Sequence, residues 1–427
     1  MGRRPPRAAY PAPSGEFLMD RRSFFAAAPA VVAAGALPAS SLAATAALNG
    51  KLINIVDDAG ADPTGATDST AKIQAAIDSV GGAGVVIAPP GTYTCSSTLT
   101  ISNSNVAIVG HSRGSVFFKF PEGVSGFMVA PGTNNVEIRH LQIVSVGAKK
   151  TANTAGVYAV APALNGGIGY LNLTDLDING FDKGVDIRYA QLSSVDGCHL
   201  WANNIGYYSK RCVNMRLSST ISERNNLWAA FVDGDANYVN FSAGTLIKDC
   251  TLVSCGGSLT VETGTLQVAH NEYTSVIGCM IDVPRPNTQW HVLFTDCSRG
   301  CITGNWVGAA KSPRGGISLV NSHEFSISGN NVLTSENSGY GIGIENGRYN
   351  SIVSNIMKQN DGIDIIVFGT SSRGNTIGNN VCLSTVNANS IGETAAFKTI
   401  ATGNSVVKGV LLNTTGGSIA ANNLVVT

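Results

Sequence analysis

The stretch SISGNNV, residues 326–332, returns in altered form as TIGNNV at 376–381 and as ATGNSV at 401–406. These copies share a six-residue pattern. It begins with an apolar residue, any residue and a small residue. The fourth position, which we call the slot, is followed by any residue and an apolar residue. The pattern recurs about every 25 residues along most of the chain. The slot is assigned to Leu176, Cys198, Thr220, Cys250, Cys279, Asn305, Asn330, Asn355, Asn379, Asn404 and, as the last candidate, Asn422.

A second short segment follows most slots, and apolar residues alternate with other residues along it. Examples are VDIRY (185–189), LTVET (259–263), ISLVN (317–321), IGIEN (342–346) and IDIIV (363–367). A period of two between Gly and Asn turns indicates short β-strands. Because a unit of this size cannot bury its own apolar face, the repeat predicts a solenoid of coils stacked ~4.8 Å apart through parallel strands.

The slot residue occupies the same turn of every coil in such a solenoid. Asn therefore lies above Asn, and the side-chain amides can hydrogen-bond in a ladder. In the earlier coils we interpret Cys198, Cys250 and Cys279 as small, buried substitutes for Asn. A disulfide between the stacked Cys250 and Cys279 remains an open alternative.

An open solenoid end exposes strand edges and requires a cap. The segment TDSTAKIQAAIDSVGG, residues 67–82, predicts a helix that Thr67 or Asp68 would N-cap and Gly81-Gly82 would end. One face of this helix is apolar and consists of Ile73, Ala76, Ile77 and Val80. The strand VVIAP follows directly.

Residues 56–93, VDDAGADPTGATDSTAKIQAAIDSVGGAGVVIAPPGTY, resemble the entry segment of the pectate-lyase-like superfamily. The resemblance implies an all-β fold, a right-handed parallel β-helix of roughly ten or more coils with an N-terminal capping helix. It leaves the activity open, because this superfamily includes lyases, hydrolases, epimerases and proteins without known chemistry. We expect the cap at 47–100 and the β-helix at 101–427.

The N-terminus resembles a twin-arginine export signal. Arg21-Arg22 precedes a moderately apolar, Ala-rich run, and cleavage would follow Ala43 or Ala46. We expect a signal peptide at 19–46, a non-native or disordered extension at 1–18, and a bacterial protein that is periplasmic or secreted. A chance arginine pair before a membrane anchor is the alternative.

The composition restricts the partners. Lys+Arg and Asp+Glu are both 28, so no net charge favours nucleic acid or an anionic membrane surface. No segment beyond the signal is long and apolar enough to span a membrane. The nine cysteines lack zinc-site spacing.

Motifs that would name an activity are scarce. GHSRG, residues 110–114, matches the nucleophile elbow of α/β-hydrolases, but an alternating strand follows it where that motif requires a helix. We therefore interpret it as a turn between strands. The catalytic combinations of polygalacturonases and alginate epimerases are absent, so no catalytic residue can be transferred from either.

Candidate site residues follow from stacking the second strand of each coil on the second strand of the coil before it. The predicted inward column is Ile187, Tyr207, Phe231, Val261, Phe294, Leu319, Ile344 and Ile365. One outward column is Arg188, Tyr208, Val232, Glu262, Thr295, Val320, Glu345 and Ile366. The other is Asp186, Gly206, Ala230, Thr260, Leu293, Ser318, Gly343 and Asp364.

This arrangement predicts a charged strip on an otherwise charge-poor chain. We expect catalytic roles for Asp233, Glu262, Lys210, Arg188 and Asp296, and substrate contacts from Asp186, Tyr208, Arg211, Asp235 and Trp228. A solvated face with incidental ion pairs is the competing interpretation. Trp201 and Trp290 could also stack on sugars, and His270 is a lesser acid/base candidate.

Three functions remain open, and a polysaccharide or oligosaccharide substrate is the expected partner of an enzyme. The preferred one is an exported polysaccharide lyase that cleaves a uronate-containing glycan by β-elimination. For this chemistry Lys210, Arg188 or Arg211 would serve as base or carboxylate clamp and Tyr208 as proton donor. The acidic trio of Asp233, Glu262 and Asp296 could hold Ca²⁺.

The alternatives are a glycoside hydrolase or glycosyl-transferring enzyme, and a non-catalytic glycan-binding or envelope protein. A hydrolase would pair Glu262 with Asp233, Asp235 or Asp296. The metal requirement is open, as is the choice between a monomer and a homotrimer.

Overall fold

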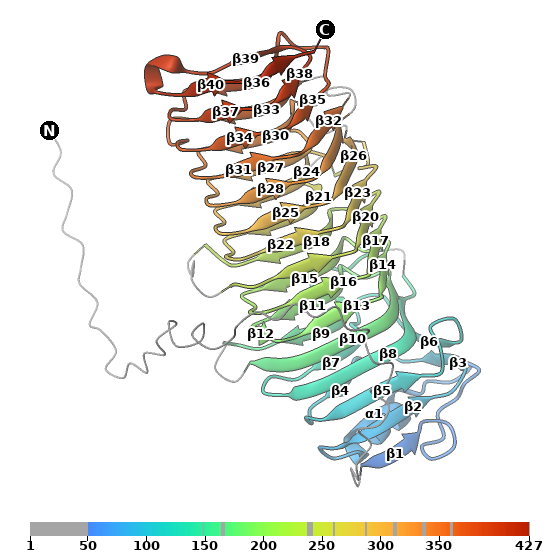
Figure 1. Cartoon of the computed structure of the whole chain (residues 1–427). Helices are drawn as coiled ribbons and strands as arrows, with labels where there is room; N and C mark the ends of the chain where they lie inside the picture. The colour runs from blue at the N-terminus through green and yellow to red at the C-terminus, as the bar shows by residue number, and fades with distance from the viewer. Residues whose placement is uncertain are drawn as a thin grey trace, which may run out of the picture. The chain divides into compact units, whose positions relative to one another are not determined.

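The computed structural model describes residues 50–147, 149–163, 167–236, 242–258, 261–286, 288–310, 314–334, 339–358 and 362–426. The predicted extension and signal sequence lie outside these residues and stay predictions. The described chain is a right-handed parallel β-solenoid of about 12 turns with one α-helix at its N-terminal end (Figure 1). The predicted fold class is confirmed. In this part of the chain, no helix is long and apolar enough to cross a membrane.

One side of the solenoid is a 13-stranded sheet, called sheet B here, to which each coil contributes one strand. Its strands are β4 (Leu99–Ile101), β7 (Phe127–Val129), β9 (Ala155–Val160), β11 (Lys183–Arg188), β15 (Ile205–Lys210), β18 (Trp228–Asp233), β21 (Gly264–Ala269), β24 (Trp290–Thr295), β27 (Ile317–Val320), β30 (Tyr340–Glu345), β33 (Ile363–Phe368), β36 (Asn389–Thr394) and β39 (Gly409–Leu411).

The 28-stranded sheet, sheet A, forms the other two sides as two rows that meet at the slot turn. The row before the turn contains β13 (Ser194–Asp196), β16 (Arg216–Ser218), β19 (Leu246–Lys248), β22 (Ser275–Ile277), β25 (Cys301–Thr303), β28 (Ser326–Ser328), β31 (Ser351–Val353), β34 (Thr376–Gly378), β37 (Ile400–Thr402) and β40 (Ile419–Ala421). The row after it contains β14 (His199–Trp201), β17 (Ile221–Glu223), β20 (Thr251–Val253), β23 (Met280–Asp282), β26 (Trp306–Ala310), β29 (Asn331–Thr334), β32 (Ile356–Lys358), β35 (Val381–Cys382), β38 (Ser405–Val406) and β41 (Leu424–Val425).

The first coils of sheet A are less regular. They contain β1 (Lys51–Asn54), β2 (Gly84–Ala88), β3 (Gly91–Thr94), β5 (Val106–Gly110), β6 (Val116–Phe120), β8 (Asn134–Ser145), β10 (Ile168–Asn179) and β12 (Ala190–Gln191). The long strands β8 and β10 run through both rows. A short 3-10 helix, η2 (Thr414–Gly416), lies in the last coil. GHSRG joins β5 to β6, so its interpretation as a turn is confirmed.

A buried side-chain ladder follows the slot turn through the upper coils. The backbone N–H of Asn330 donates to Asn355 Oδ1 (3.0 Å), and that of Asn355 donates to Asn380 Oδ1 (2.9 Å). The same contact joins Asn380 to Asn404 at 2.9 Å. Each ladder Asn also donates its amide N–H to a backbone carbonyl of a neighbouring coil. The ladder therefore satisfies polar groups that water cannot reach.

The predicted ladder was wrong by one residue in two coils. Asn380 and Asn423 occupy the slot, where we had expected Asn379 and Asn422. Asn379 and Asn422 instead have positive φ values of 54° and 53°. The strand register shows why, because Ile327 aligns with Ile352 and Ile377, which places Asn379 level with Gly329. Asn replaces Gly at this left-handed turn residue because it tolerates that conformation.

The cysteines in the ladder are buried, as expected. The backbone N–H of Cys198 donates to Thr220 Oγ1 (3.3 Å), and that of Cys279 donates to Asn305 Oδ1 (2.8 Å). All nine cysteines are described and all are free thiols. Cys250 and Cys279 contact each other through their thiols without a disulfide.

Helix α1 (Thr70–Ser79) covers the N-terminal end of the solenoid. Its predicted face is buried, but the N-cap is Ser69, one residue after the predicted Asp68. Asp68 still accepts the N–H of Thr70 (3.1 Å). The Gln74 amide donates to Thr100 O and accepts from Thr100 N, both at 2.8 Å, so this side chain replaces the missing neighbour of β4.

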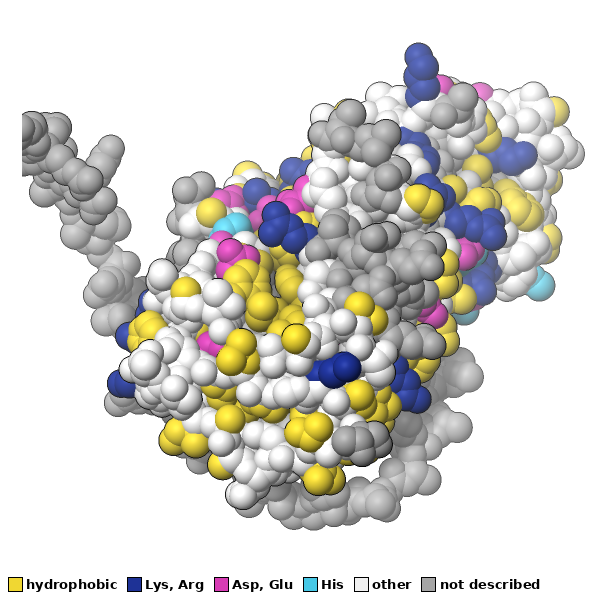
Figure 2. All heavy atoms as spheres, turned by 90° about the horizontal axis from the view of Figure 1, so that it is seen from above, with side chains coloured by type: hydrophobic (Ala, Val, Ile, Leu, Met, Phe, Trp, Pro, Cys, Tyr) yellow, Lys and Arg dark blue, Asp and Glu magenta, His cyan; other side chains and the backbone are white. Residues whose placement is uncertain are grey.

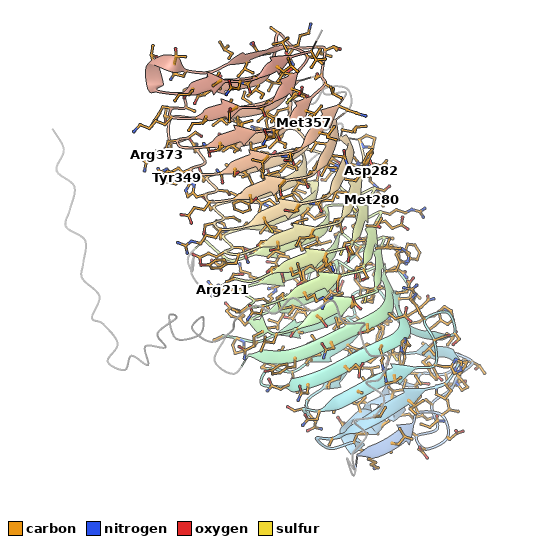
Figure 3. All side chains as sticks on the ribbon, viewed as in Figure 1. Arg211, Met280, Asp282, Tyr349, Met357 and Arg373 are labelled. Atoms are coloured by element: carbon orange, nitrogen blue, oxygen red, sulfur yellow. The ribbon has the colours of Figure 1, made fainter. Side chains whose placement is uncertain are left out.

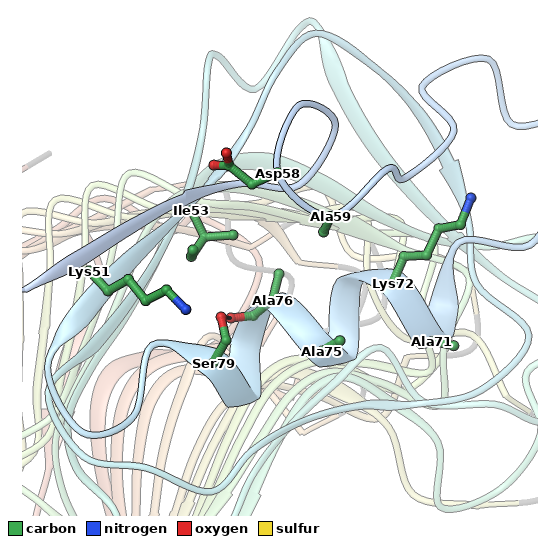
Figure 4. A pocket seen from close by; sticks show the side chains of 9 residues that line it. All are labelled: Lys51, Ile53, Asp58, Ala59, Ala71, Lys72, Ala75, Ala76 and Ser79. Carbon is green, nitrogen blue, oxygen red and sulfur yellow. Dashed lines mark hydrogen bonds between the residues drawn. The ribbon is translucent and has the colours of Figure 1, made fainter.

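A hollow of about 430 Å³ lies between α1 and β1 (Figure 4). Its lining combines alanines of the helix with Ile53 and Ala59, and Lys51 and Lys72 stand at its sides. No carboxylate other than Asp58 lines it. The hollow belongs to the cap and offers no acid/base pair for chemistry.

The ladder register can be tested with two neighbouring asparagines. We expect Asn380→Ala to lower stability by about 2–4 kcal/mol, because it leaves buried amide groups of Asn355 without partners. Asn379→Gly is the matched control and should leave stability unchanged or slightly higher, since Gly prefers positive φ. Thermal unfolding followed by circular dichroism measures both. Equal destabilisation by the two changes would show that the ladder is misplaced.

Candidate active site

The candidate site lies where the strands of sheet B end, on the outer face. In one outer column Arg188, Lys210 and Asp233 align, and in the other Asp186, Tyr208 and Phe231 align. Higher coils continue the two columns with Thr295, Val320 and Glu345, and with Leu293, Ser318 and Gly343, as predicted.

The predicted columns were wrong in the coils of β15, β18, β21 and β33. Tyr208 aligns with Asp186, whereas it was expected to align with Arg188. In the inward column above Ile187, Ser209 and Val232 occupy the positions at which Tyr207 and Phe231 were expected. Similarly, Ile365 pairs with Ile342. The pattern placed the largest apolar residue inward, yet Phe231 packs on the outside against Tyr208, with ring centroids 5.4 Å apart.

At the lower end of the site, an ion pair holds a guanidinium over an aromatic ring. Arg188 donates two hydrogen bonds to the buried Asp186, at 2.8 and 2.7 Å. Its guanidinium lies 5.4 Å from the centre of the Tyr208 ring. Lys183 is 5.6 Å from the same ring. Two cations therefore lie within cation–π distance of the Tyr208 ring.

Asp233 is the centre of the site. Its Oδ2 lies 3.2 Å from Lys210 Nζ and accepts a hydrogen bond from the Tyr208 hydroxyl at 3.2 Å. Lys210 also reaches Asp235 (3.1 Å), which is held in turn by Arg211 (2.7 Å). The structure thus brings together seven of the ten predicted residues: Asp186, Arg188, Tyr208, Lys210, Arg211, Asp233 and Asp235.

His270 connects this group to Asp296. It directly follows β21, with Nδ1 3.9 Å from Asp233 Oδ1 and Nε2 3.5 Å from Asp296 Oδ2. Nδ1 is buried and has no hydrogen-bond partner. His270 was expected to be a lesser candidate in a turn, and the strand of this coil was expected at 259–263. The alternating run Leu266–Ala269 just before His270 was the signal that could have corrected this.

A hollow of about 450 Å³ opens beside these residues. His270, Asp296, Asn321 and His323 line it together with Ala236, Cys297 and Ser298. A space of this size is suited to a sugar residue. Viewed from above, basic, acidic and histidine side chains gather in more than one patch, while much of the visible surface is uncharged (Figure 2).

The environment determines the protonation of two groups. Burial raises the pKa of Tyr208, and the negative charge of Asp233 raises it further, so the phenol stays protonated. For Lys210, burial opposes the charged form, but Asp233 and Asp235 outweigh it and the pKa is raised. Lys210 is consequently a permanent cation at neutral pH, and Tyr208 is a proton donor.

Glu262 and Trp228 lie elsewhere. Glu262 precedes β21 and accepts a hydrogen bond from the Trp290 indole at the start of β24, whereas Asp296 follows the end of that strand. The separation along the strand is about 15–20 Å, so Glu262 pairs with neither Asp233 nor Asp296. Trp228 opens β18 and is only 4% exposed, which removes it from any sugar-binding surface.

A metal centre has no support in the described residues. No group of three or more His, Cys, Asp or Glu side chains in them could hold an ion. The predicted acidic trio is not assembled, because Glu262 is remote and cations neutralise Asp233 and Asp235. The Ca²⁺ hypothesis therefore has no ligand set here.

A second histidine cluster lies on sheet A. His199 contacts Asp177 through Nδ1 (3.0 Å) and Glu223 through Nε2 (3.2 Å), so it joins three consecutive coils. Trp201 donates to Asp177 (2.7 Å) and stacks on His199. The hydrogen bond to Asp177 is the main cause that raises the pKa of His199. Both ring nitrogens of His199 are occupied, so we interpret this cluster as a structural contact that joins the three coils, and we call it the His199 pin.

The fold is that of the parallel β-helix class, and the family match given next supports a carbohydrate-active enzyme or glycan-binding protein. The family model described as "Rhamnogalacturonase A/epimerase, pectate lyase-like" matches residues 52–274, which is more than half of the chain. The chain belongs to this pectate lyase-like family. Residues 287–413 also match the model of a periplasmic copper-binding protein, NosD. The described residues contain no group that could hold copper.

Solved structures with the same fold are distant in sequence. The A-module of the Azotobacter vinelandii mannuronan C-5 epimerase AlgE6 is 16% identical, with a TM-score of 0.62 over 88% of this chain and 99% of that one. Bacteriophage phi29 gene product 12 is 12% identical, with a TM-score of 0.65, over 82% of this chain and 52% of its own.

DFA-IIIase from Arthrobacter chlorophenolicus is 15% identical, with a TM-score of 0.57 over 77% of this chain and 93% of that one. No curated protein matches the sequence. At these identities the likeness concerns the fold alone.

The His199 pin should give a pH-dependent stability. Because its folded pKa is raised, its stabilisation is complete below the unfolded pKa of about 6.5 and is lost as the pH rises through the folded pKa. We expect His199→Gln to lower the melting temperature more at about pH 5.5 than at about pH 9. His111→Gln, in an exposed turn, is the control. An equal loss at both pH values would contradict the ion-pair interpretation.

Proposed function

We propose that the protein is a polysaccharide-active enzyme that abstracts the proton α to the carboxylate of a uronate-containing glycan and eliminates across the adjacent glycosidic bond. The observation that carries this proposal is the convergence of a phenol, an imidazole and an ammonium group on Asp233. β-Elimination requires a proton donor, a base and a cation that stabilises the carboxylate as charge develops.

The protonation states divide the roles. Lys210 keeps its proton, so it acts with Arg188 as the clamp for the uronate carboxylate. His270 is the base, because it lines the hollow and its buried Nδ1 faces Asp233, which leaves Nε2, 3.5 Å from Asp296, to take the proton. The 3.9 Å separation from Asp233 is loose, as expected of a catalytic contact that tightens around substrate.

The reaction balances with these groups alone. His270 takes the proton from C5, the C4–O bond breaks as a C4–C5 double bond forms, and Tyr208 gives its proton to the departing oxygen. Asp233 faces both His270 and the Tyr208 oxygen, so it can pass the proton from His270 to the Tyr208 phenolate and restore the starting state. If Tyr208 instead gives its proton to C5 on the face opposite to His270 and the C4–O bond stays intact, the same groups perform an epimerisation.

Hydrolysis is the second candidate, favoured by the placement of Asp233 and Asp296 on either side of His270. They belong to coils two apart, so their carboxyl groups are on the order of 10 Å apart, near the upper limit for inverting glycosidases. In that case one carboxylic acid protonates the leaving oxygen and the other activates water.

Export supports a role on extracellular or envelope polysaccharide. The N-terminal sequence resembles an export signal, and residues 287–413 resemble a periplasmic protein family.

Product analysis separates the reactions. Residues 47–427 would be incubated with polygalacturonate, rhamnogalacturonan, alginate and a neutral glucan, and both absorbance at about 235 nm and reducing ends would be followed. We expect both signals to rise together on an acidic polymer. Reducing ends alone indicate hydrolysis, deuterium uptake at C5 without cleavage indicates epimerisation, and binding without any product contradicts catalysis.

Two conservative variants test the assigned roles. Tyr208→Phe removes the donor hydroxyl and His270→Gln removes the base, and we expect each to reduce kcat by about 10²–10⁴-fold without lowering the melting temperature. Tyr340→Phe is the matched control, because its hydroxyl contacts Ser318 several coils higher on the same sheet. Full activity in both test variants would overturn the site.

Asp296→Asn distinguishes the two mechanisms. In elimination Asp296 only orients His270, so the variant should keep part of the wild-type turnover. In hydrolysis it supplies a reacting carboxyl group, and turnover should fall as far as in His270→Gln.

A further inference from the structure

A row of hydrogen-bond donors leads away from the hollow along the turns that follow sheet B. The row consists of Ser298, His323, Arg348 and Arg373, and we call it the donor row. Consecutive members are joined by parallel bridges, so each lies one coil, or ~4.8 Å, above the last. Ser298 and His323 also line the hollow beside His270. The donor row is therefore continuous with the candidate active site.

The tautomer of His323 makes it a donor. Its Nδ1 accepts the backbone N–H of Arg348 at 3.2 Å, which leaves the ring proton on Nε2. Burial, with a further contribution from Arg348, lowers the pKa of His323, so the ring is neutral at pH 7.

The two arginines carry unneutralised charge. Arg348 donates through Nε to the carbonyl of Ser371 (3.3 Å), and Arg373 Nε is buried without a hydrogen-bond partner. Neither has a carboxylate within ion-pair distance among the described residues. Like charges on adjacent coils repel, and a bound anion would relieve that repulsion.

A neighbouring arginine shows the contrast. Arg299, on the same flank, is neutralised by Glu324 (3.1 Å) and Glu272 (3.8 Å) and lies over the Tyr273 ring. Figure 3 shows Arg373 and Tyr349 on the same edge of the solenoid as Arg211 of the candidate site, with Met280 and Asp282 on the opposite edge. The free positive charge thus lies on the flank that carries the candidate site.

We propose that the donor row binds the anionic groups of an extended acidic glycan and holds that chain along the solenoid axis as it leaves the active site. This inference rests on the proposed function, which supplies the acidic glycan. A carboxylate or a sulfate ester can each accept the two-pronged hydrogen bonds of a guanidinium. Two guanidinium groups stacked one coil apart suit a polymer with regularly repeated charges.

Direct binding tests the donor row independently of turnover. Titration calorimetry would be run on His270→Gln, to prevent turnover, with polygalacturonate, dextran sulfate and neutral dextran. We expect Arg348→Gln/Arg373→Gln in this background to bind the anionic polymer at least tenfold more weakly, with a shallower dependence on salt. Arg299→Gln is the matched control and should change affinity less than twofold.

The outcomes separate this proposal from the proposed function. Unchanged affinity in the double variant, an equal loss in Arg299→Gln, or equal binding of neutral dextran would overturn the donor row, even if the wild-type protein degrades polygalacturonate. Arginine-dependent binding without turnover by the wild-type protein would support the donor row and overturn the enzyme proposal. Arginine-dependent binding of dextran sulfate alone would support the row and assign it to sulfate esters.

Discussion

Hydrogen bonding along the solenoid axis is the constraint on which this structure depends. Each strand pairs in parallel with the equivalent strand of the next coil, and a coil that slipped by one residue would turn its apolar side chains outward. The ladder from Asn305 to Asn423 opposes such slips, because a displaced coil would leave buried amides without partners. The variable lengths of the coils are absorbed in the turns, and the strands keep their register.

This register converts distance in sequence into a fixed spacing along one flank. Lys210, Asp233, His270 and Asp296 end or directly follow consecutive strands of sheet B, and the rise of the coils sets their separations. A rigid stack of parallel strands holds such groups with little freedom, which favours preorganised electrostatics. The same geometry extends upward through His323 to Arg348 and Arg373, where the balance changes from paired charges to excess positive charge.

Asp233 illustrates how one carboxylate can organise a site. It adds to burial in raising the pKa of Tyr208, it raises the pKa of Lys210 together with Asp235 against the effect of burial, and it faces the unpartnered nitrogen of His270. By contrast, His199 on sheet A also lies between two carboxylates, but both its ring nitrogens are engaged and it lines none of the described cavities. The difference between a structural pin and a candidate base therefore lies in unsatisfied groups and open space.

The sequence alone determined the solenoid, the capping helix, the turn at GHSRG and a charged strip that contains most of the candidate site, because strand periodicity and turn residues are local signals. It could not determine the register in coils where local patterns are ambiguous. Asn379 and Asn380 are chemically identical, and only the pairing with neighbouring coils decides which one is buried. The outward position of Phe231, the remoteness of Glu262 and the central place of His270 likewise depend on contacts between coils. A side chain's neighbours in a solenoid come from residues about 25 positions away, so tertiary stacking, and not local sequence, decides which groups meet.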